Sequence, residues 1–129
     1  MQRLQKILNF GLRAVSGRRK YDHISDVRDE LGWLTARQLY ELQSLNLLHK
    51  IRTTGEPQAL ASQLLTNSEF RSRTTRQDAD LALPRVRTEA GKRRFLYRVA
   101  QDYNALPLDL REVSLSAFKR KLHVIIHDI

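Results

Sequence analysis

Nine cations gather between Arg71 and Arg98, where only three carboxylates oppose them. Guanidinium and ammonium groups in such excess bind phosphates, so this chemistry predicts a polyanionic ligand. A solvated face with some salt bridges is the alternative, although three carboxylates are too few to pair nine cations. We expect phosphate contacts from these residues: Arg71, Arg73, Arg76, Arg87, Lys92, Arg93, Arg94 and Arg98.

Gly91 and the three cations that follow it open a helix predicted over 92–105. Unpaired amides at a helix N-terminus attract anions, and cations beside them would strengthen such a site. Arg94 and Arg98 are four residues apart and should share one face of this helix. The pattern therefore predicts a phosphate site at the start of the helix.

Aromatic side chains are interleaved with these cations. Phe95, Val99, Tyr103 and Leu106 recur at helical spacing, which favours a buried stripe over an exposed stacking surface. Tyr97 lies off that stripe, so it is the best candidate for stacking on a nucleic-acid base.

A second basic segment, Arg18-Arg19-Lys20, precedes Tyr21 in a predicted loop. It is either a second phosphate contact or an ordinary charged connection between two helices. The sequence pattern leaves both readings open.

Other chemistries find little support. His123 and His127 have helical i, i+4 spacing, but no glutamate lies between them and no third ligand is evident. Asp78 and Asp80 stand in a basic environment without a second carboxylate cluster. We find no phosphate-binding glycine loop, nucleophile elbow or catalytic triad, so we predict no metal, cofactor or catalytic residue.

Composition limits the possibilities further. The chain has 129 residues, a net charge of +9 and 41% apolar residues, which suits one folded domain with a polyanionic partner. It contains no cysteine, and no apolar run is long enough to cross a bilayer. We therefore expect an intracellular protein, in the nucleus or the cytoplasm, that does not span a membrane.

The elements that position these residues are mostly helices. We predict a mostly α, single-domain bundle of about five helices over residues 1–129, with a small β-hairpin-like element near 79–88 and an exposed basic loop at 66–76. Ser25 and Ser114 are candidate N-caps, and Thr35 with Gln38 forms a capping-box pattern. The predicted helices cover residues 2–16, 26–31, 36–52, 57–65, 92–105 and 115–127.

The helix after Thr35 is apolar around much of its circumference, which predicts a central position. Its main buried face should contain Ala36, Leu39, Tyr40, Leu47, Leu48 and Ile51, and Leu42 with Leu45 widens it.

The chain resembles the region that follows the polymerase core in non-LTR (LINE-type) retrotransposon reverse transcriptases. The resemblance covers essentially the whole chain, with the motifs in the family's order and spacing. They are the run from Leu4 to the GRRKYDH loop at 17–23, LGWL at 31–34, TRQ at 75–77, LP at 83–84, G-x-x-x-F-x-Y from Gly91, N-x-LP from Asn104 and S-x-FK from Ser116. Departures include Thr35 for the family's proline and Tyr103 for its tryptophan.

The resemblance implies contact with RNA or DNA during target-primed reverse transcription, beside the remainder of a reverse transcriptase polypeptide. The F/Y-x-D-D motif of the family's polymerase site is absent from this sequence, so we expect no polymerase activity from the chain itself. The alternative function is a structural buttress or protein-interaction domain with a solvated basic surface. The oligomeric state and the preference between RNA and DNA stay open.

Overall fold

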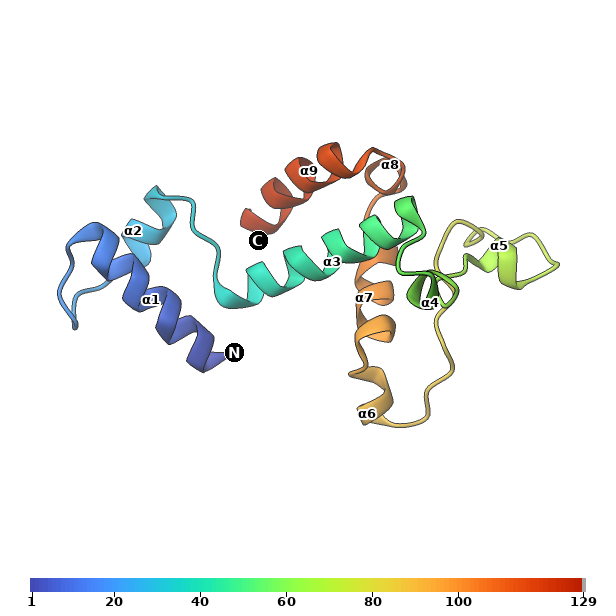
Figure 1. Ribbon diagram of the computed structural model, residues 1–129, viewed down its shortest axis with the longest axis horizontal. Coiled ribbons are helices and arrows are strands. Elements are labelled where there is room, and N and C mark those ends of the chain that lie inside the picture. Colours follow the sequence, from blue (N-terminus) through green and yellow to red (C-terminus); the bar gives the residue numbers. More distant parts are fainter. Residues whose placement is uncertain (129) are drawn as a thin grey trace. The chain divides into compact units, whose positions relative to one another are not determined.

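The computed structural model describes residues 1–128, which are mostly helical, so the predicted mostly α character is confirmed (Figure 1). Ile129 lies outside the described residues. The described residues form two compact units, 1–43 with 123–128 and 44–122. The helices are α1 (Gln2–Ser16), α2 (Ser25–Glu30), α3 (Ala36–Thr54), α4 (Gln58–Ala61), α5 (Asn67–Phe70), α6 (Glu89–Lys92), α7 (Phe95–Asn104), α8 (Leu108–Arg111) and α9 (Leu115–His127).

The predicted number of about five helices is too low, since residues 1–128 contain nine. Five of these exceed one turn, and the other four, α4, α5, α6 and α8, have four residues each. A single turn is too short to show helical periodicity in the sequence. The long predicted helix at 57–65 is reduced to α4, and α8 was not predicted.

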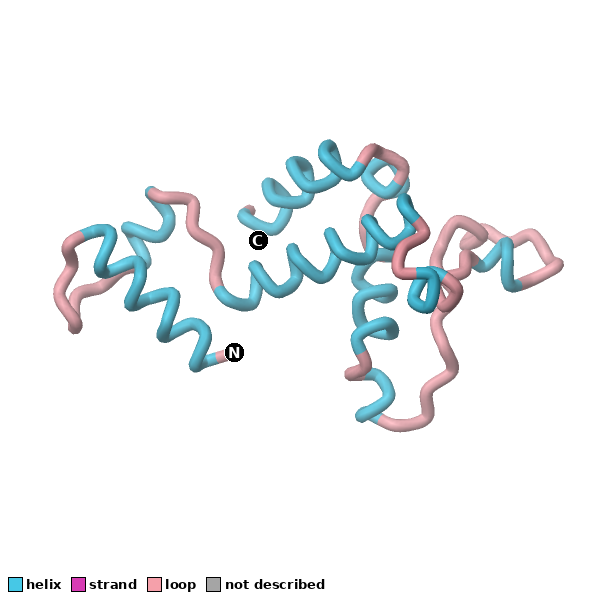
Figure 2. The backbone as a smooth tube through the Cα atoms, in the orientation of Figure 1, coloured by secondary structure: helices cyan, strands magenta, loops and turns pink. Residues whose placement is uncertain are grey.

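The small β-hairpin near 79–88 is wrong. Within residues 1–128 the structure contains helices and loops without a strand (Figure 2), and the one β-bridge joins Thr66 to Leu81. Leu81 thus pairs with a residue outside the predicted hairpin, and Pro84 offers no N–H to a partner strand. The loop predicted at 66–76 also needs correction, because α5 occupies part of it.

The unit of residues 1–43 and 123–128 has a small apolar core of Leu12, Ile24 and Val27. Gly17 ends α1 with a left-handed φ of 69° and donates its N–H to Arg13. Polar side chains join the elements: Gln5 accepts a hydrogen bond from the Ala36 N–H at 2.8 Å. Ser25 is not an N-cap, because that position is taken by Ile24.

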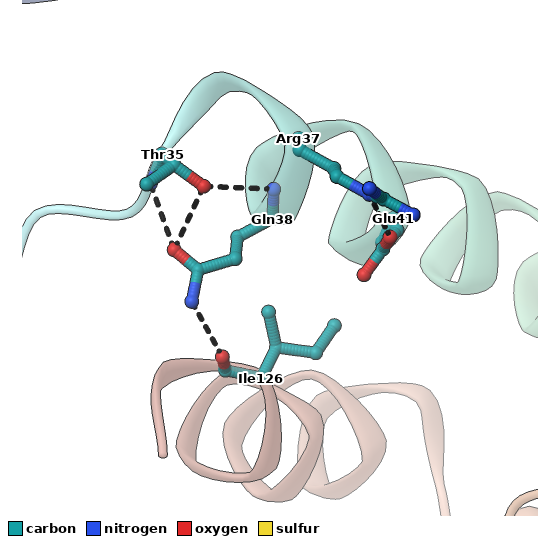
Figure 3. Close-up of polar contacts among 5 residues, drawn as sticks. All are labelled: Thr35, Arg37, Gln38, Glu41 and Ile126. Atoms are coloured by element: carbon teal, nitrogen blue, oxygen red, sulfur yellow. Dashed lines mark hydrogen bonds and ion pairs between the residues drawn. The ribbon is translucent and has the colours of Figure 1, made fainter. Parts of the chain in front are cut away.

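The capping box before α3 is confirmed (Figure 3). The Thr35 N–H donates to Gln38 Oε1 at 2.9 Å, and the Gln38 N–H donates to Thr35 Oγ1 at 3.3 Å. Gln38 Nε2 also donates to the Ile126 carbonyl of α9 at 3.0 Å, which the sequence pattern did not predict. One glutamine therefore both starts α3 and fixes the end of α9 against it.

The apolar face of α1 is largely uncovered. Leu4, Ile7, Leu12 and Val15 share one face by their helical spacing, but only Leu12 is buried, and the other three are exposed, as is Phe10. Helical periodicity predicted the bounds of α1 correctly, but the described residues of this small unit bury little of its face.

The unit of residues 44–122 has a core built around a buried histidine. His49 of α3 stacks on Phe118 of α9, with 4.0 Å between ring centroids, and its ring is 1% exposed. Leu48 and Ile51 are also buried, as predicted, whereas Leu47 is exposed. Tyr40, at the start of α3 in the other unit, is exposed as well. In α7 and just after it, the predicted stripe is buried at Val99 and Tyr103 and half-buried at Phe95 and Leu106, and Phe118 and Leu122 of α9 are buried as well.

The hydrogen bonds of His49 fix its tautomer. Nε2 lies 3.0 Å from the Val113 carbonyl, which can only accept, so Nε2 carries the proton. Nδ1 then accepts from the Tyr103 hydroxyl at 3.0 Å. Burial, together with the nearby Arg52 charge, lowers the pKa of His49 below its ordinary 6.5, against the opposing effect of the Val113 hydrogen bond. Burial also raises the pKa of Tyr103, which keeps its proton available.

We predict that the stability of the fold decreases as pH falls below 6.5 toward the lower pKa of folded His49. In this window the unfolded chain binds the proton more readily than the folded chain, so acid favours unfolding. The midpoint of thermal unfolding, followed by circular dichroism between about pH 7.5 and about pH 5, should show this fall.

The variant His49→Gln should be less stable at neutral pH by about 1 to 3 kcal/mol and should show a flatter pH profile. His23→Gln removes an exposed histidine and is the matched control, with the pH profile of the unchanged chain. An unchanged pH profile in His49→Gln would refute the assignment.

Candidate nucleic-acid interface

The loop that carries Arg71, Arg73 and Arg76 is closed at its base by backbone pairing. The bridge between Thr66 and Leu81 is flanked by two hydrogen bonds, from the Asn67 N–H to Asp80 O and from the Ala82 N–H to Leu65 O, both 2.8 Å. In such a pair, the N–H and C=O of Leu81 point away from Thr66 and need other partners.

Asn104 at the end of α7 supplies both partners. Its Oδ1 accepts from the Leu81 N–H at 2.8 Å, and its Nδ2 donates to the Leu81 carbonyl at 3.0 Å. The Asn104 side-chain amide thus makes the two hydrogen bonds that a neighbouring β-strand would make to Leu81. Leu81 is itself buried, so water cannot replace these bonds. This contact explains the asparagine of the N-x-LP motif by its structural role.

An ion pair holds the adjacent residue. Arg111 Nη1 of α8 lies 2.9 Å from Asp80 Oδ1, and the Arg111 side chain is 8% exposed. Asp78 has different partners, the N–H and hydroxyl of Thr75. The two carboxylates therefore serve separate structural contacts.

Further contacts order the start of the loop. Thr66 and Glu69 form a capping box at α5, with the Thr66 N–H donating to Glu69 Oε2 at 2.7 Å. These hydrogen bonds, mainly from the Thr66 N–H and also from its side chain, lower the pKa of Glu69. Asn67 Nδ2 donates to the Gln77 carbonyl across the loop at 2.8 Å. The base of the loop, called here the loop neck (residues 65–67 and 77–82), is thereby held together, while residues 71–76 at its tip are exposed to solvent.

The three arginines of this loop are exposed. Among the residues that the structure describes, no ion pair engages Arg71, Arg73 or Arg76. Their guanidinium groups are thus available to an external anion.

The single helix predicted over 92–105 is wrong, because α6 and α7 are separated at Arg93 and Arg94. Arg94 has an extended backbone, with φ −60° and ψ 141°. The Arg93 N–H donates back to the Glu89 and Ala90 carbonyls, so Arg93 closes α6. Lys92 lies in the last turn of α6, where the dipole favours a cation.

The Gly91 N–H is not free to bind an anion as predicted. The Gly91 N–H donates to Thr88 Oγ1 at 3.1 Å, so this amide is already paired. A Cβ at Gly91 would lie 3.1 Å from Val86 Cβ, which explains the glycine by close packing. Lys92 Nζ pairs with Glu89 at 2.7 Å.

The next helix start along the chain is that of α7. Arg94 is its N-cap residue, and no side chain caps the helix. Helical geometry leaves the first amides of α7 without intrahelical partners. Arg93 and Arg94 are exposed beside them, as is Arg87 in the preceding loop, whereas Arg98 and Tyr97 are half-buried. Arg98 begins the second turn of α7, where its N–H donates to the Arg94 carbonyl.

The second predicted segment, Arg18-Arg19-Lys20, belongs to the other compact unit. Arg18 pairs with Asp26 at 3.0 Å, which favours its role as a helix connection. The Arg19 N–H donates to Asp22, and Lys20 lies over the Tyr21 ring. The Arg19 and Lys20 side chains are exposed.

Sequence reasoning missed two exposed residues beside the loop. Phe70 ends α5 and directly precedes Arg71, and it is 69% exposed. Arg85 is exposed as well, although it was not chosen as a phosphate contact. The pairing of an aromatic residue with a cation in Phe70-Arg71 is the signal that could have indicated Phe70 from the sequence, and Arg85 already belongs to the nine clustered cations.

Within residues 1–128 no three histidine or acidic side chains gather as a metal site would require. The rings of His123 and His127 are stacked, with 6.4 Å between centroids. None of the helices there combines the length and apolar character needed to span a bilayer.

Comparison with known proteins gives no match to this chain among family models, curated proteins or solved structures.

We predict that Asn104→Ala destabilises the unit of residues 44–122 by about 2 to 3 kcal/mol, because it leaves both backbone groups of buried Leu81 unpaired. Urea unfolding measures this loss, and hydrogen exchange of the Leu81 amide should accelerate with it. Asn104→Asp keeps the acceptor for the Leu81 N–H, so the exchange of that amide should be slower than in the alanine variant. Equal exchange in all three proteins would contradict the role assigned to Asn104.

Proposed function

We propose that this chain binds nucleic acid through backbone phosphates, as the C-terminal region of a non-LTR retrotransposon reverse transcriptase. The observation that carries the proposal is the set of exposed arginines on the loop after α5, which have no carboxylate partner among the described residues. Arg87, Arg93 and Arg94 add exposed cations within the same compact unit.

Phosphate contact accounts for the excess charge better than a neutralised surface does. Lys92 and Arg18 are paired with carboxylates, but the loop arginines are not. Contacts of this kind carry no sequence information, so binding should depend on salt and be weakly sequence-specific. The resemblance to the retrotransposon family supplies the proposed setting, target-primed reverse transcription, with polymerisation assigned to other parts of that polypeptide.

A second candidate function is supported by α1. Its exposed side chains Leu4, Ile7, Phe10 and Val15 form an apolar surface of the kind that packs against another protein. This surface would suit a buttress that docks on the remainder of a reverse transcriptase. The two functions are separated by whether the chain binds nucleic acid with salt-dependent affinity.

We predict that Arg71, Arg73 and Arg76 together contribute to binding of RNA and of duplex DNA. Replacing all three with alanine should weaken both affinities about tenfold or more near 0.1 M salt and reduce the slope of log K against log salt by about 2 to 3. Filter binding over a salt series measures both quantities. The Lys92, Arg93 and Arg94 triple alanine variant should lower affinity across all sequences, although the ion pair of Lys92 makes its effect smaller.

The matched control replaces Lys119, Arg120 and Lys121 of α9, three exposed cations in the same unit. It removes the same charge and should retain most of the affinity. If it weakens binding as much as the loop variant does, net charge explains the binding and the assigned sites are wrong. Salt-independent or absent binding by the unchanged chain favours the buttress.

A further inference from the structure

A groove of about 570 Å³ lies beside the basic loop, within the unit of residues 44–122. It is formed by the chain after α4, by α5 with Arg71, by residues 82–85 and by α7. Its apolar lining consists mainly of Leu64, Leu65, Phe70, Leu83, Leu96 and Ala100. A volume of this size is typical of sites that take a compact, largely apolar ligand group.

Phe70 gives the groove an accessible aromatic face. Phe70 is 69% exposed although it lines the groove, whereas Leu64 and Ala100, which also line it, are buried. Its backbone is held at the end of α5 by a hydrogen bond from the Phe70 N–H to the Thr66 carbonyl at 3.0 Å. An exposed ring beside an apolar lining can stack on a planar group.

The charges around the groove select an anionic occupant. Arg71 and Arg85 line it, and both are exposed. Every lining residue lies within the described part of the chain, and none is an aspartate or glutamate. The groove therefore combines an apolar, aromatic surface with positive charge, which complements a ligand that joins flat apolar groups to phosphates.

We propose that the groove binds single-stranded nucleic acid, with one unpaired base against Phe70 and its flanking phosphates on Arg71 and Arg85. This inference rests on the proposed function and specifies the form of the polyanion. A duplex keeps the faces of its bases inside the stack, so it can meet the arginines but cannot place a base in the groove. Phe70 thus distinguishes single strands from duplexes, whereas the arginines of the loop bind both.

The test compares a 12-nucleotide single strand carrying one 2-aminopurine with a 12-base-pair duplex of the same sequence, at one salt concentration. Phe70→Ala should weaken single-strand binding about tenfold and leave duplex binding unchanged, because it removes stacking on a base and no charge. Phe70→Tyr, which retains the aromatic face, should restore the affinity. The 2-aminopurine fluorescence should fall on binding to the unchanged chain and to Phe70→Tyr, and fall less with Phe70→Ala.

The exposure of Phe70 makes these substitutions compatible with folding, and an unchanged thermal midpoint confirms that. If Phe70→Ala binds both nucleic acids as the unchanged chain does, the groove inference is wrong while phosphate binding stands. If the unchanged chain binds neither nucleic acid, both proposals fail. A peptide of alternating glutamate and leucine that binds in a Phe70-dependent manner, without competition from the single strand, would assign the groove to a protein partner instead.

Discussion

The paired hydrogen bonds between Asn104 and Leu81 are the constraint on which the candidate interface depends. They satisfy a buried backbone position that its β-bridge to Thr66 leaves open on the other side. Without them, the neck of the basic loop would expose an unpaired N–H and C=O to a nearly dry environment, at a cost comparable to a lost hydrogen bond for each. The loop can therefore project its cations because a side chain from α7 completes its base.

Tyr103, which directly precedes Asn104, is buried in the core of the same unit. Its hydroxyl donates to His49, and its ring lies near the guanidinium groups of Arg52 and Arg111. Arg111 in turn holds Asp80, next to Leu81. Consecutive side chains at the end of α7 thus connect the packing of the helices to the position of the loop. A change in the buried aromatic cluster should consequently reach the loop neck through a short series of contacts.

The distribution of charge has a related consequence. Carboxylates near the basic region are already engaged, Asp80 by Arg111, Asp78 by Thr75 and Glu69 by Thr66. These contacts occupy the three carboxylates, and among the described residues the loop arginines Arg71, Arg73 and Arg76 have no ion-pair partner. A polyanion can then approach these arginines without first displacing an internal ion pair, which favours fast, salt-dependent association.

The sequence by itself determined the helical class, the bounds of α1 and α9, the capping box at Thr35 and the clustering of cations, because periodicity, caps and charge are local properties. Tertiary structure alone decided that Leu81 pairs with Thr66, that Asn104 completes this pair and that Phe70 borders a groove. It also decided the break between α6 and α7, where the Arg94 backbone is extended. These features arise from contacts between residues far apart in the chain, and a local pattern carries no record of which distant group will supply the missing hydrogen bond.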